Sequence, residues 1–378
     1  MKKIAIIGAG ISGLFFANLF KGNPNYQITI YEKNTSLDLD EGYGIQLSVN
    51  SIKLLNKIGF ENLNSQDKFN PNKIDFYSVN QNMKICDLNI SDFNTMDCKY
   101  TTLKRSILIK YLKENLNTEI IKYDHNISKI NYIKNLIELV FQNNISRVCD
   151  FLIISDGLFS KAKTLITNNL VKPSFNGSVA IRGIINKKEL TGINLDNISL
   201  FLGKNFHNVI YPMNKMGDFN YIAILKHHLK FQESKNYEFL NDNLSINKFL
   251  RGLPYNTKIK KIKYYPVFIS NNFYEPVKNN LFLIGDAFFA VPPSFAQGAS
   301  QSIEGAFELY ESIQNNSYSN FHINRVKKLK MIKNRSKINQ FAFHLSSPIM
   351  ISMRNFFLKI LTKNKKFLEN YLGKVYRN

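Results

Sequence analysis

Three glycines with the spacing of a phosphate-binding loop stand near the start of the chain. Gly8, Gly10 and Gly13 form a Gly-x-Gly-x-x-Gly pattern directly after an apolar run, residues 4–7. In such a loop the first glycine makes a tight turn, the second lets the backbone approach a pyrophosphate, and the third lets helix and strand pack closely. Glu32 follows about 20 residues later, where a carboxylate can accept hydrogen bonds from ribose hydroxyls. The sequence therefore predicts a dinucleotide site.

The elements around this loop are those that the chemistry requires. Residues 3–7 predict a buried strand, residues 14–20 continue with mostly helical spacing, and Gln27–Tyr31 predicts a second strand that ends at Glu32. A helix N-terminus favours phosphate because its first N–H groups have no partner inside the helix. This βαβ unit alone leaves the choice between FAD and NAD(P) open.

Two further segments precede the middle of the chain. Residues 41–60 predict a glycine-rich extended piece that leads into a helix with Ile52, Leu55 and Ile58 on its apolar stripe. Residues 101–112 predict a helix with Arg105 near its start.

Two more segments each place an aspartate after an apolar strand. Residues 149–165 predict a strand that ends in Asp156-Gly157 and is followed by a helix start. Residues 280–309 predict a buried strand that ends in Gly285-Asp286, a proline-rich loop, and a helix that begins near Ala299.

In this order and spacing the segments resemble the FAD-dependent aromatic hydroxylases of the 4-hydroxybenzoate and salicylate hydroxylase type, from Lys2 to about Leu309. The resemblance implies an α/β (α+β) fold: a Rossmann-like FAD-binding domain, an interleaved antiparallel-sheet substrate domain and C-terminal helices. We expect the FAD domain to be discontinuous. Its expected ranges are 1–71, 99–175 and 266–312; those of the substrate domain are 72–98 and 176–265; and the helical segment is 313–378.

The resemblance also implies the cofactor-binding residues, with FAD held tightly and non-covalently. It places Gly8, Gly10, Ile11, Ser12 and Gly13 at the pyrophosphate, Glu32 and Lys33 at the adenosine ribose, and Ile127 beside the adenine. Arg105 would contact the phosphate or ribityl region, Asp156-Gly157 would serve FAD and NAD(P)H, and Gly285-Asp286 would bind the ribityl chain. Gln46 and Pro293 are implied cofactor contacts, and Gln297, Gly298, Ala299 and Ser300 would direct N–H groups at the flavin N1–C2=O edge.

The activity that the resemblance implies is NAD(P)H- and O₂-dependent hydroxylation of an aromatic or other electron-rich small molecule through a flavin C4a-hydroperoxide. The catalytic group is then the flavin rather than a side chain. Two alternatives stay open. One is an epoxidase, halogenase-like enzyme or reductase acting on a larger, quinone- or isoprenoid-like substrate. The other is a membrane-associated FAD-binding protein without turnover.

The sequence departs from that family at two positions. Phe288-Phe289 occupies a stretch where many relatives have histidine, so the implied substrate and proton-handling roles do not carry over there. Lys163 stands where relatives usually have arginine, which replaces a bidentate donor by a point charge. The absence of tryptophan argues against the flavin halogenases, whose signature contains it.

The substrate half reads as a set of strands. Residues 178–185, 200–202, 208–212 and 220–224 predict an antiparallel sheet, to which residues 72–98 could add edge strands. Arg182 lies in an apolar strand and could pair a carboxylate or phenolate, unless it only extends from a sheet edge to water. The predicted substrate-pocket residues are Arg182, Tyr211, Phe289 and Pro293. We expect His207, His227 and His228 at the surface.

The composition of the chain indicates which kinds of ligand and partner to expect. The net charge is +22, but the lysines are spread along the chain and no nucleic-acid motif accompanies them, so we expect no nucleic acid. The three cysteines have no metal-like spacing, and we expect no metal site. No signal peptide or membrane-spanning run is evident, and a cytoplasmic monomer or homodimer is the expected state.

The C-terminal residues 349–375 combine apolar residues at helical spacing with lysines. A basic amphipathic helix of this kind can lie on an anionic membrane, here the inner surface. We favour the alternative that its apolar face packs on the protein itself or on a second subunit, which is usual for helices of globular proteins.

Overall fold

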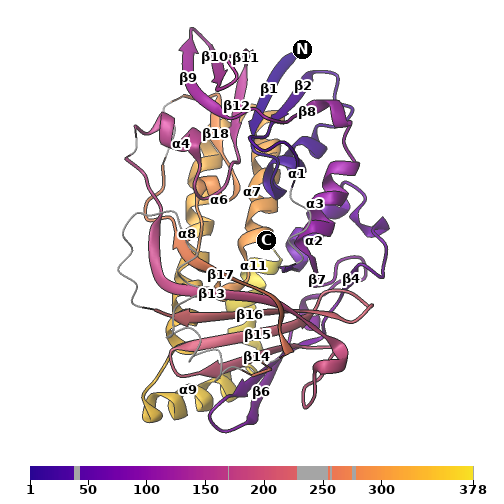
Figure 1. Cartoon of the computed structure of the whole chain (residues 1–378), viewed down its shortest axis with the longest axis vertical. Coiled ribbons are helices and arrows are strands. Elements are labelled where there is room, and N and C mark those ends of the chain that lie inside the picture. Colours follow the sequence, from indigo (N-terminus) through magenta and orange to yellow (C-terminus); the bar gives the residue numbers. More distant parts are fainter. Residues whose placement is uncertain (38–42, 169, 228–253, 256–257, 275–277, 378) are drawn as a thin grey trace.

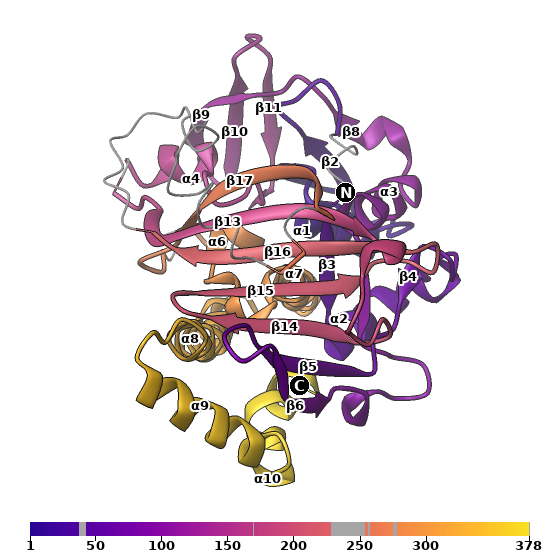
Figure 2. The ribbon, with the colours of Figure 1, turned by 60° about the horizontal axis from the view of Figure 1, so that its bottom comes forward.

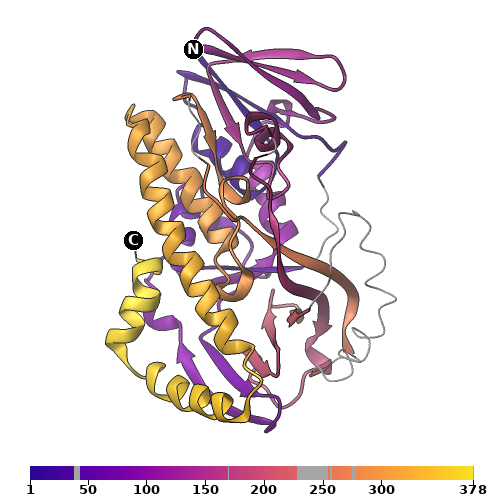
Figure 3. The same ribbon diagram turned by 90° about the vertical axis from the view of Figure 1, so that its left-hand side faces the viewer.

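The computed structural model describes residues 1–37, 43–168, 170–227, 254–255, 258–274 and 278–377. A parallel sheet with its helices forms one end of the molecule, and a larger sheet crosses the other end (Figure 1). The long helices α7 and α8 run alongside both (Figure 3). Parallel and antiparallel sheets and C-terminal helices are all present, as the sequence predicts.

The parallel sheet carries the glycine loop at the point where its strand order reverses. Strand β1 lies between β12 and β2, so chain segments leave it toward both sides. Ligands bind outside the carboxyl ends of the strands at such a switch point. In spatial order the strands are β18 (Leu281–Leu283), β12 (Phe151–Ile154), β1 (Lys2–Ile7), β2 (Tyr26–Tyr31) and β8 (Ile121–Lys122).

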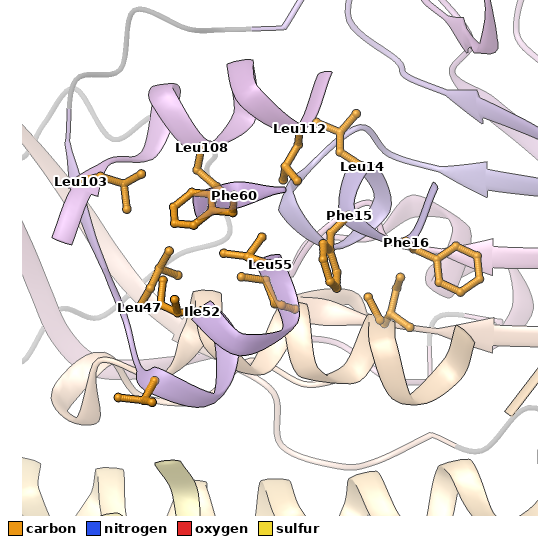
Figure 4. Close-up of a cluster of buried hydrophobic side chains, with 14 of the residues drawn as sticks. Leu14, Phe15, Phe16, Leu47, Ile52, Leu55, Phe60, Leu103, Leu108 and Leu112 are labelled. Atoms are coloured by element: carbon orange, nitrogen blue, oxygen red, sulfur yellow. The ribbon is translucent and has the colours of Figure 1, made fainter. Parts of the chain in front are cut away.

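The main apolar core lies between this sheet and four helices. These are α1 (Ile11–Leu19), α2 (Val49–Asn56), α3 (Arg105–Glu114) and α7 (Gly298–Gln314). Figure 4 shows Leu14 and Phe15 of α1 beside Leu55 of α2 and Leu112 of α3; none of these four side chains is exposed to solvent. Each such side chain contributes about 1.5–3 kcal/mol on burial. This packing fixes where α1 begins, and therefore where the glycine loop lies.

The larger sheet has seven strands (Figure 2). All neighbours are antiparallel except β14 and β5, which pair in parallel. Chain segments far apart in sequence thus meet in one sheet. In spatial order the strands are β17 (Lys260–Ile269), β13 (Ser174–Asn186), β16 (Asp218–Lys226), β15 (Phe206–Pro212), β14 (Ile198–Gly203), β5 (Lys73–Ser78) and β6 (Met83–Asn89).

A small sheet corrects one prediction. Residues 101–104 form strand β7 (Thr101–Lys104) rather than the first turn of a helix, and α3 begins at Arg105. The β-branched Thr101 and Thr102 favour the strand, which pairs with β3 (Gly44–Leu47) and β4 (Lys68–Phe69). Residues 41–42 of the predicted extended piece lie outside the described residues. A further sheet consists of β9 (Ile127–Ile133), β10 (Leu136–Phe141) and β11 (Ser146–Cys149).

The described residues before the C-terminal part also form short elements. They are the helices α4 (Lys161–Ile166) and α6 (Gly285–Phe288) and the 3₁₀ turns Phe60–Asn62, Ser91–Phe93, Thr118–Ile120, Lys187–Glu189 and Pro293–Phe295.

The C-terminal helices give the two parts of the predicted amphipathic segment different surroundings. They are α8 (Tyr318–Phe343), α9 (Pro348–Leu361), α10 (Lys365–Leu368), a π turn (Glu369–Gly373) and α11 (Lys374–Tyr376). Leu372, Val375 and Tyr376 are buried in the main core. By contrast, the apolar stripe of α9, which includes Phe356 and Phe357, is exposed and does not pack on the described part of the chain. Packing of this stripe on a second subunit stays a prediction. No described helix is long and apolar enough to cross a membrane.

The predicted surface position of His207 is also wrong. His207 lies in the middle of the seven-stranded sheet and is 2% exposed, because its strand β15 is covered by the end of α8. Its Nδ1 lies 2.9 Å from Nε2 of His344. His227 is half-buried just after β16, and His228 lies outside the described residues.

Candidate active site

Three loops leave the same edge of the parallel sheet. Ile7 pairs with Ile154, and Ile154 pairs with Leu283, so the residues that follow these strands are neighbours. Gly8 has a φ of +98°, which L side chains rarely adopt, and its N–H donates to the carbonyl of Tyr31 at 2.8 Å. The sequence-predicted motifs at residues 8–13, 155–157 and 284–286 are therefore brought together.

The two inner glycines differ in what surrounds them. A Cβ on Gly13 would stand 2.3 Å from the Gly8 carbonyl oxygen, so this glycine is required for packing of α1 on β1. A Cβ on Gly10 would meet no atom of the described chain closer than the Ser155 carbonyl oxygen at 4.0 Å. Gly10 also has an ordinary extended backbone, φ −81°. Packing and backbone conformation therefore do not require glycine at position 10. Its small size instead leaves the backbone accessible to a ligand, as a phosphate-binding loop requires.

Glu32 holds the glycine loop from its outer side. Its carboxylate accepts hydrogen bonds from the N–H of Ala9 at 2.9 Å and from the N–H of Asn34 at 3.1 Å. A carboxylate has about four acceptor positions, so this geometry leaves capacity for ribose hydroxyls. The neighbouring predicted contacts differ: Lys33 is exposed, whereas Ile127 is buried at the first position of β9.

Asp286 lies in a concave position. Solvent reaches its side chain, yet protein atoms surround it closely enough that burial raises its pKa to about 6, against the opposing charges of Arg105 and Lys163. Asp286 lines a small cavity together with Gly298 and Gln301. Burial likewise raises the pKa of Asp156, whose Oδ2 accepts from the N–H of Ala162 at 3.1 Å. Both acids act on the pKa of Lys163, so they lie on either side of one buried cation.

The N-terminus of α7 faces the same region. Within the described residues no side chain caps this helix, whose first residues are Gly298, Ala299 and Ser300. Ser300 is fully buried, and its hydroxyl accepts from the N–H of Ser48 at 3.1 Å. The hydroxyl of Ser48 lies 3.4 Å from the Gln297 amide nitrogen. The first turn of α7 is therefore fixed to the end of β3, and its N–H groups are pre-oriented for an anion.

Strand β3 connects this region to the seven-stranded sheet. Gln46 accepts a hydrogen bond from the hydroxyl of Tyr100 at 2.7 Å and also interacts with the hydroxyl of Tyr211. The N–H of Gly44 donates to the side-chain oxygen of Asn220 at 2.7 Å. Burial raises the pKa of Tyr211 far above its usual value, so its hydroxyl stays protonated. Gln46 thus connects the small sheet with Tyr211 of the seven-stranded sheet.

Arg182 lies on the same side as Tyr211. Its guanidinium is 5.9 Å from the ring centroid of Tyr43, and its charge opposes the burial effect on the pKa of Tyr211. The side chain is half-buried in β13, between Ile222 and Lys263 of the neighbouring strands. It does not simply extend from a sheet edge, because β13 is an interior strand.

The other two pocket candidates have different surroundings. Phe289 is 3% exposed, and its ring stacks on Phe273 with centroids 4.1 Å apart. The structure thus gives Phe289 a packing role, and its contact with substrate stays a prediction. Pro293 is half-buried and begins the 3₁₀ turn before α7.

Solved structures with this fold include two enzymes with small aromatic or heterocyclic ligands. HpxO of Klebsiella pneumoniae, complexed with FAD and uric acid, is 15% identical, covers 99% of this chain and 96% of its own, and has a TM-score of 0.82. A salicylate hydroxylase substrate complex is 17% identical, covers 100% of this chain and 95% of its own, and has a TM-score of 0.81. The chain therefore shares its fold with HpxO and with salicylate hydroxylase. The predicted fold class is confirmed.

Sequence relatives point the same way. A 3-amino-4-hydroxybenzoate 2-monooxygenase of Streptomyces platensis is 23% identical over 227 residues, which are 59% of this chain and 56% of the enzyme. The chain thus spans about half the length of that relative. A 6-hydroxynicotinate 3-monooxygenase of Pseudomonas fluorescens is 22% identical over 318 residues, 80% of each chain. No protein-family model matches the chain. The resemblance to aromatic hydroxylases seen in the sequence is confirmed.

Several residues of this hydroxylase fold were not predicted as site residues. Ser48, Tyr43 and Tyr100 contact Ser300, Arg182 and Gln46, respectively, through the small sheet. Nothing in their local sequence marks them, because their role depends on tertiary pairing of β3 with β7. Lys163 is different, because the sequence already marked it as a departure from the arginine that relatives usually have at this position.

Proposed function

We propose that the protein is an FAD-dependent monooxygenase that uses NAD(P)H and O₂ to hydroxylate an aromatic or other electron-rich small molecule. The observation that carries this proposal is the convergence of the glycine loop and Gly285-Asp286 at one edge of the parallel sheet, where Gly285 lies against Ser12 of α1 and Ser302 of α7. The seven-stranded sheet carries Arg182 and Tyr211. FAD would supply the redox chemistry at this site, taking electrons from NAD(P)H and activating O₂.

The residues present fit this cofactor. Gly10 leaves space for a pyrophosphate and Glu32 retains acceptor capacity for a ribose. Asp286 is accessible to solvent, so it can accept hydrogen bonds from polyol hydroxyls, and Arg105 provides a nearby positive charge. The first N–H groups of α7 favour the negative charge that a reduced flavin carries. Each of these groups acts by binding or orienting.

The substrate side of the site supports an aromatic acid or phenol. Arg182 offers a cation and Tyr211 a protonated hydroxyl on the same wall. Together they suit a carboxylate or phenolate. The named substrates of the relatives are hydroxylated aromatic or heteroaromatic acids, which agrees with that chemistry. The seven-stranded sheet would exclude water from the reacting ring.

The test is an assay of the purified yellow protein. We expect NADH or NADPH oxidation and O₂ uptake to rise on addition of one member of a panel of hydroxybenzoates, hydroxypyridine acids and phenols. Absence of both responses across the panel, with FAD bound, contradicts the proposal.

Labelled oxygen separates hydroxylation from the predicted alternatives. With ¹⁸O₂, a hydroxylase or epoxidase places label in its product, whereas a reductase places none. The structure of the product then distinguishes a phenol from an epoxide.

The partners of this activity are a small substrate and O₂. Monomer and homodimer both stay as predicted states, and a cytoplasmic location stays a proposal. Peripheral membrane contact is a separate proposal, because it concerns residues of α9 rather than the site.

A further inference from the structure

Helix α9 exposes a continuous apolar stripe. Ile349, Phe356 and Phe357 are 73%, 62% and 50% exposed. Met350, Met353 and Ile360 are exposed as well. The positions 349, 353, 356 and 360 follow helical spacing, and 350 and 357 lie beside them, so the six side chains share one face. Exposed apolar patches of this kind mark contact surfaces.

The stripe faces away from the molecule. Ile351 and Arg354 are the residues of α9 that are buried in the described structure, and Leu358 packs against the main core. These three lie on the opposite face of the helix from the stripe. Figures 1 and 2 show α9 at the end of the molecule remote from the parallel sheet. The stripe is therefore presented without blocking the candidate active site.

Basic residues border the stripe. Residues 348–377 contain seven Lys or Arg and one acidic residue, Glu369, which pairs with Arg377. Lys359, Lys363, Lys365 and Lys366 are exposed, and none of them has an acidic partner within the described ranges. Around the helix axis, Lys359 lies next to the stripe, and Lys363 follows just after the end of α9. The surface thus combines an apolar band with unpaired positive charge.

A groove adjoins the same face. It has a volume of about 470 Å³ and lies between α9 and the β5–β6 hairpin. Met83, Ile85 and Phe356 supply apolar walls, and Lys204 and Lys359 supply basic groups. The remaining lining residues include neutral polar side chains such as Asn80, Gln81 and Asn355, so the groove is a mixed polar and apolar border of the stripe.

We propose that α9 docks the protein on a membrane surface that contains anionic lipid. The helix would lie in the plane of the interface, with Phe356 and Phe357 among the acyl chains and the lysines at the headgroups. Charge complementarity selects this occupant over a second copy of the chain, because two copies would bring like-charged lysines together. This inference is independent of the proposed activity.

The test is co-sedimentation of the purified full-length protein with vesicles of neutral phosphatidylcholine, and with vesicles that also contain phosphatidylglycerol. We expect binding to the anionic vesicles to be about tenfold or more stronger, and to fall with added salt. The double variant Phe356→Ser/Phe357→Ser should lose binding, and Lys363→Gln/Lys366→Gln should weaken it by about tenfold or more.

Matched variants keep the test specific. Tyr132→Ser/Ile133→Ser removes two side chains that are 44% and 45% exposed at the other end of the molecule, and Lys122→Gln/Lys129→Gln removes two distant charges. Both should bind as the wild type does. Circular dichroism melting verifies that every variant is folded.

Three outcomes overturn the proposal: no vesicle binding by the folded wild type, equal binding of α9 and control variants, or equal binding to neutral and anionic vesicles. A fourth is a concentration-dependent dimer in sedimentation that the Phe356/Phe357 variant abolishes without any vesicle binding. That result would assign the stripe to a second copy.

Discussion

The ammonium group of Lys163 donates a hydrogen bond to the backbone carbonyl of Ala287 across 2.8 Å. This contact joins the helix that follows Asp156 to the residue that follows Asp286. Lys163 is 3% exposed, and burial lowers its pKa while the charges of Asp156 and Asp286 oppose that shift. A point-charge donor on a flexible stem can reach a single carbonyl in this confined space. The lysine therefore acts as a fixed cation that connects the two acidic motifs.

Replacing Lys163 by Met should lower both the stability of the protein and its affinity for FAD. The buried Ala287 carbonyl loses its donor, which costs about 1–3 kcal/mol of unfolding free energy. Asp286 loses a nearby positive charge, so its pKa should rise further. We expect the variant to have a lower Tm than the wild type, and to bind FAD more weakly at pH 6 than at pH 8. Thermal melts and FAD titration measure the two effects. Equal FAD affinity of variant and wild type at both pH values would show that the lysine is only structural.

The contrast between Gly10 and Gly13 gives a second prediction. Gly13→Ala forces a Cβ to within 2.3 Å of the Gly8 carbonyl oxygen and should lower stability by about 1–3 kcal/mol. Gly10→Ala meets no such clash and should leave the Tm of the FAD-free protein nearly unchanged. It should nevertheless weaken FAD binding about tenfold or more, or about 1.4 kcal/mol. Denaturant titration and FAD titration separate these cases. If FAD binds Gly10→Ala as tightly as wild type, the pyrophosphate does not lie on this loop.

These two glycines show what the sequence can determine. Residues 3–13 specify a local unit whose strand, turn and helix are neighbours in the chain, so spacing alone predicts their arrangement. The Ser48–Ser300 and Gln46–Tyr211 contacts join segments more than 150 residues apart, and no local pattern encodes them. His207 was misplaced for the same reason, since the helix that covers it comes from residues near 343. Tertiary packing also determines the conformation of residues 101–104, where strand pairing with β3 and β4 overrides the helical pattern.

Asp286 should make the FAD-free protein less stable as pH rises. Its folded pKa of about 6 exceeds the ordinary 3.8, so the native state binds the proton more tightly than the unfolded state does. Stability from this group is therefore present below pH 3.8 and is lost between pH 3.8 and about 6. Asp286→Asn, which cannot ionise, should have a higher Tm than wild type at pH 8 and a similar Tm near pH 4. FAD affinity should fall in the same variant. A Tm difference that does not change with pH would contradict the assignment.

The His207–His344 pair should make the protein less stable as pH falls. Burial lowers the pKa of His344 to about 4, and burial lowers the pKa of His207 well below its usual value, so both are neutral in the native state at pH 6. The unfolded state takes up protons near pH 6.5, and stability is consequently lost as pH falls from about 6.5 to about 4. His344→Gln should reduce this acid sensitivity. Melting curves between pH 4 and 8 compare the slopes, with His322→Gln as a control at a half-buried histidine. An unchanged slope in His344→Gln would exclude the pair as its cause.

Arg182 and Tyr211 should affect different parts of substrate recognition. Arg182→Met removes the cation, so the KM for an acidic substrate should rise about 10- to 100-fold, as expected for a charge-assisted hydrogen bond. A substrate that lacks the carboxylate should lose much less. Tyr211→Phe keeps the ring, which packs in the core, and removes a hydroxyl whose raised pKa keeps it a hydrogen-bond donor. Its effect should therefore be similar for substrates with and without a carboxylate. Steady-state kinetics with a matched pair, a hydroxybenzoate and the corresponding phenol, measures both variants. Equal losses of Arg182→Met on the acid and on the phenol would place the substrate carboxylate elsewhere.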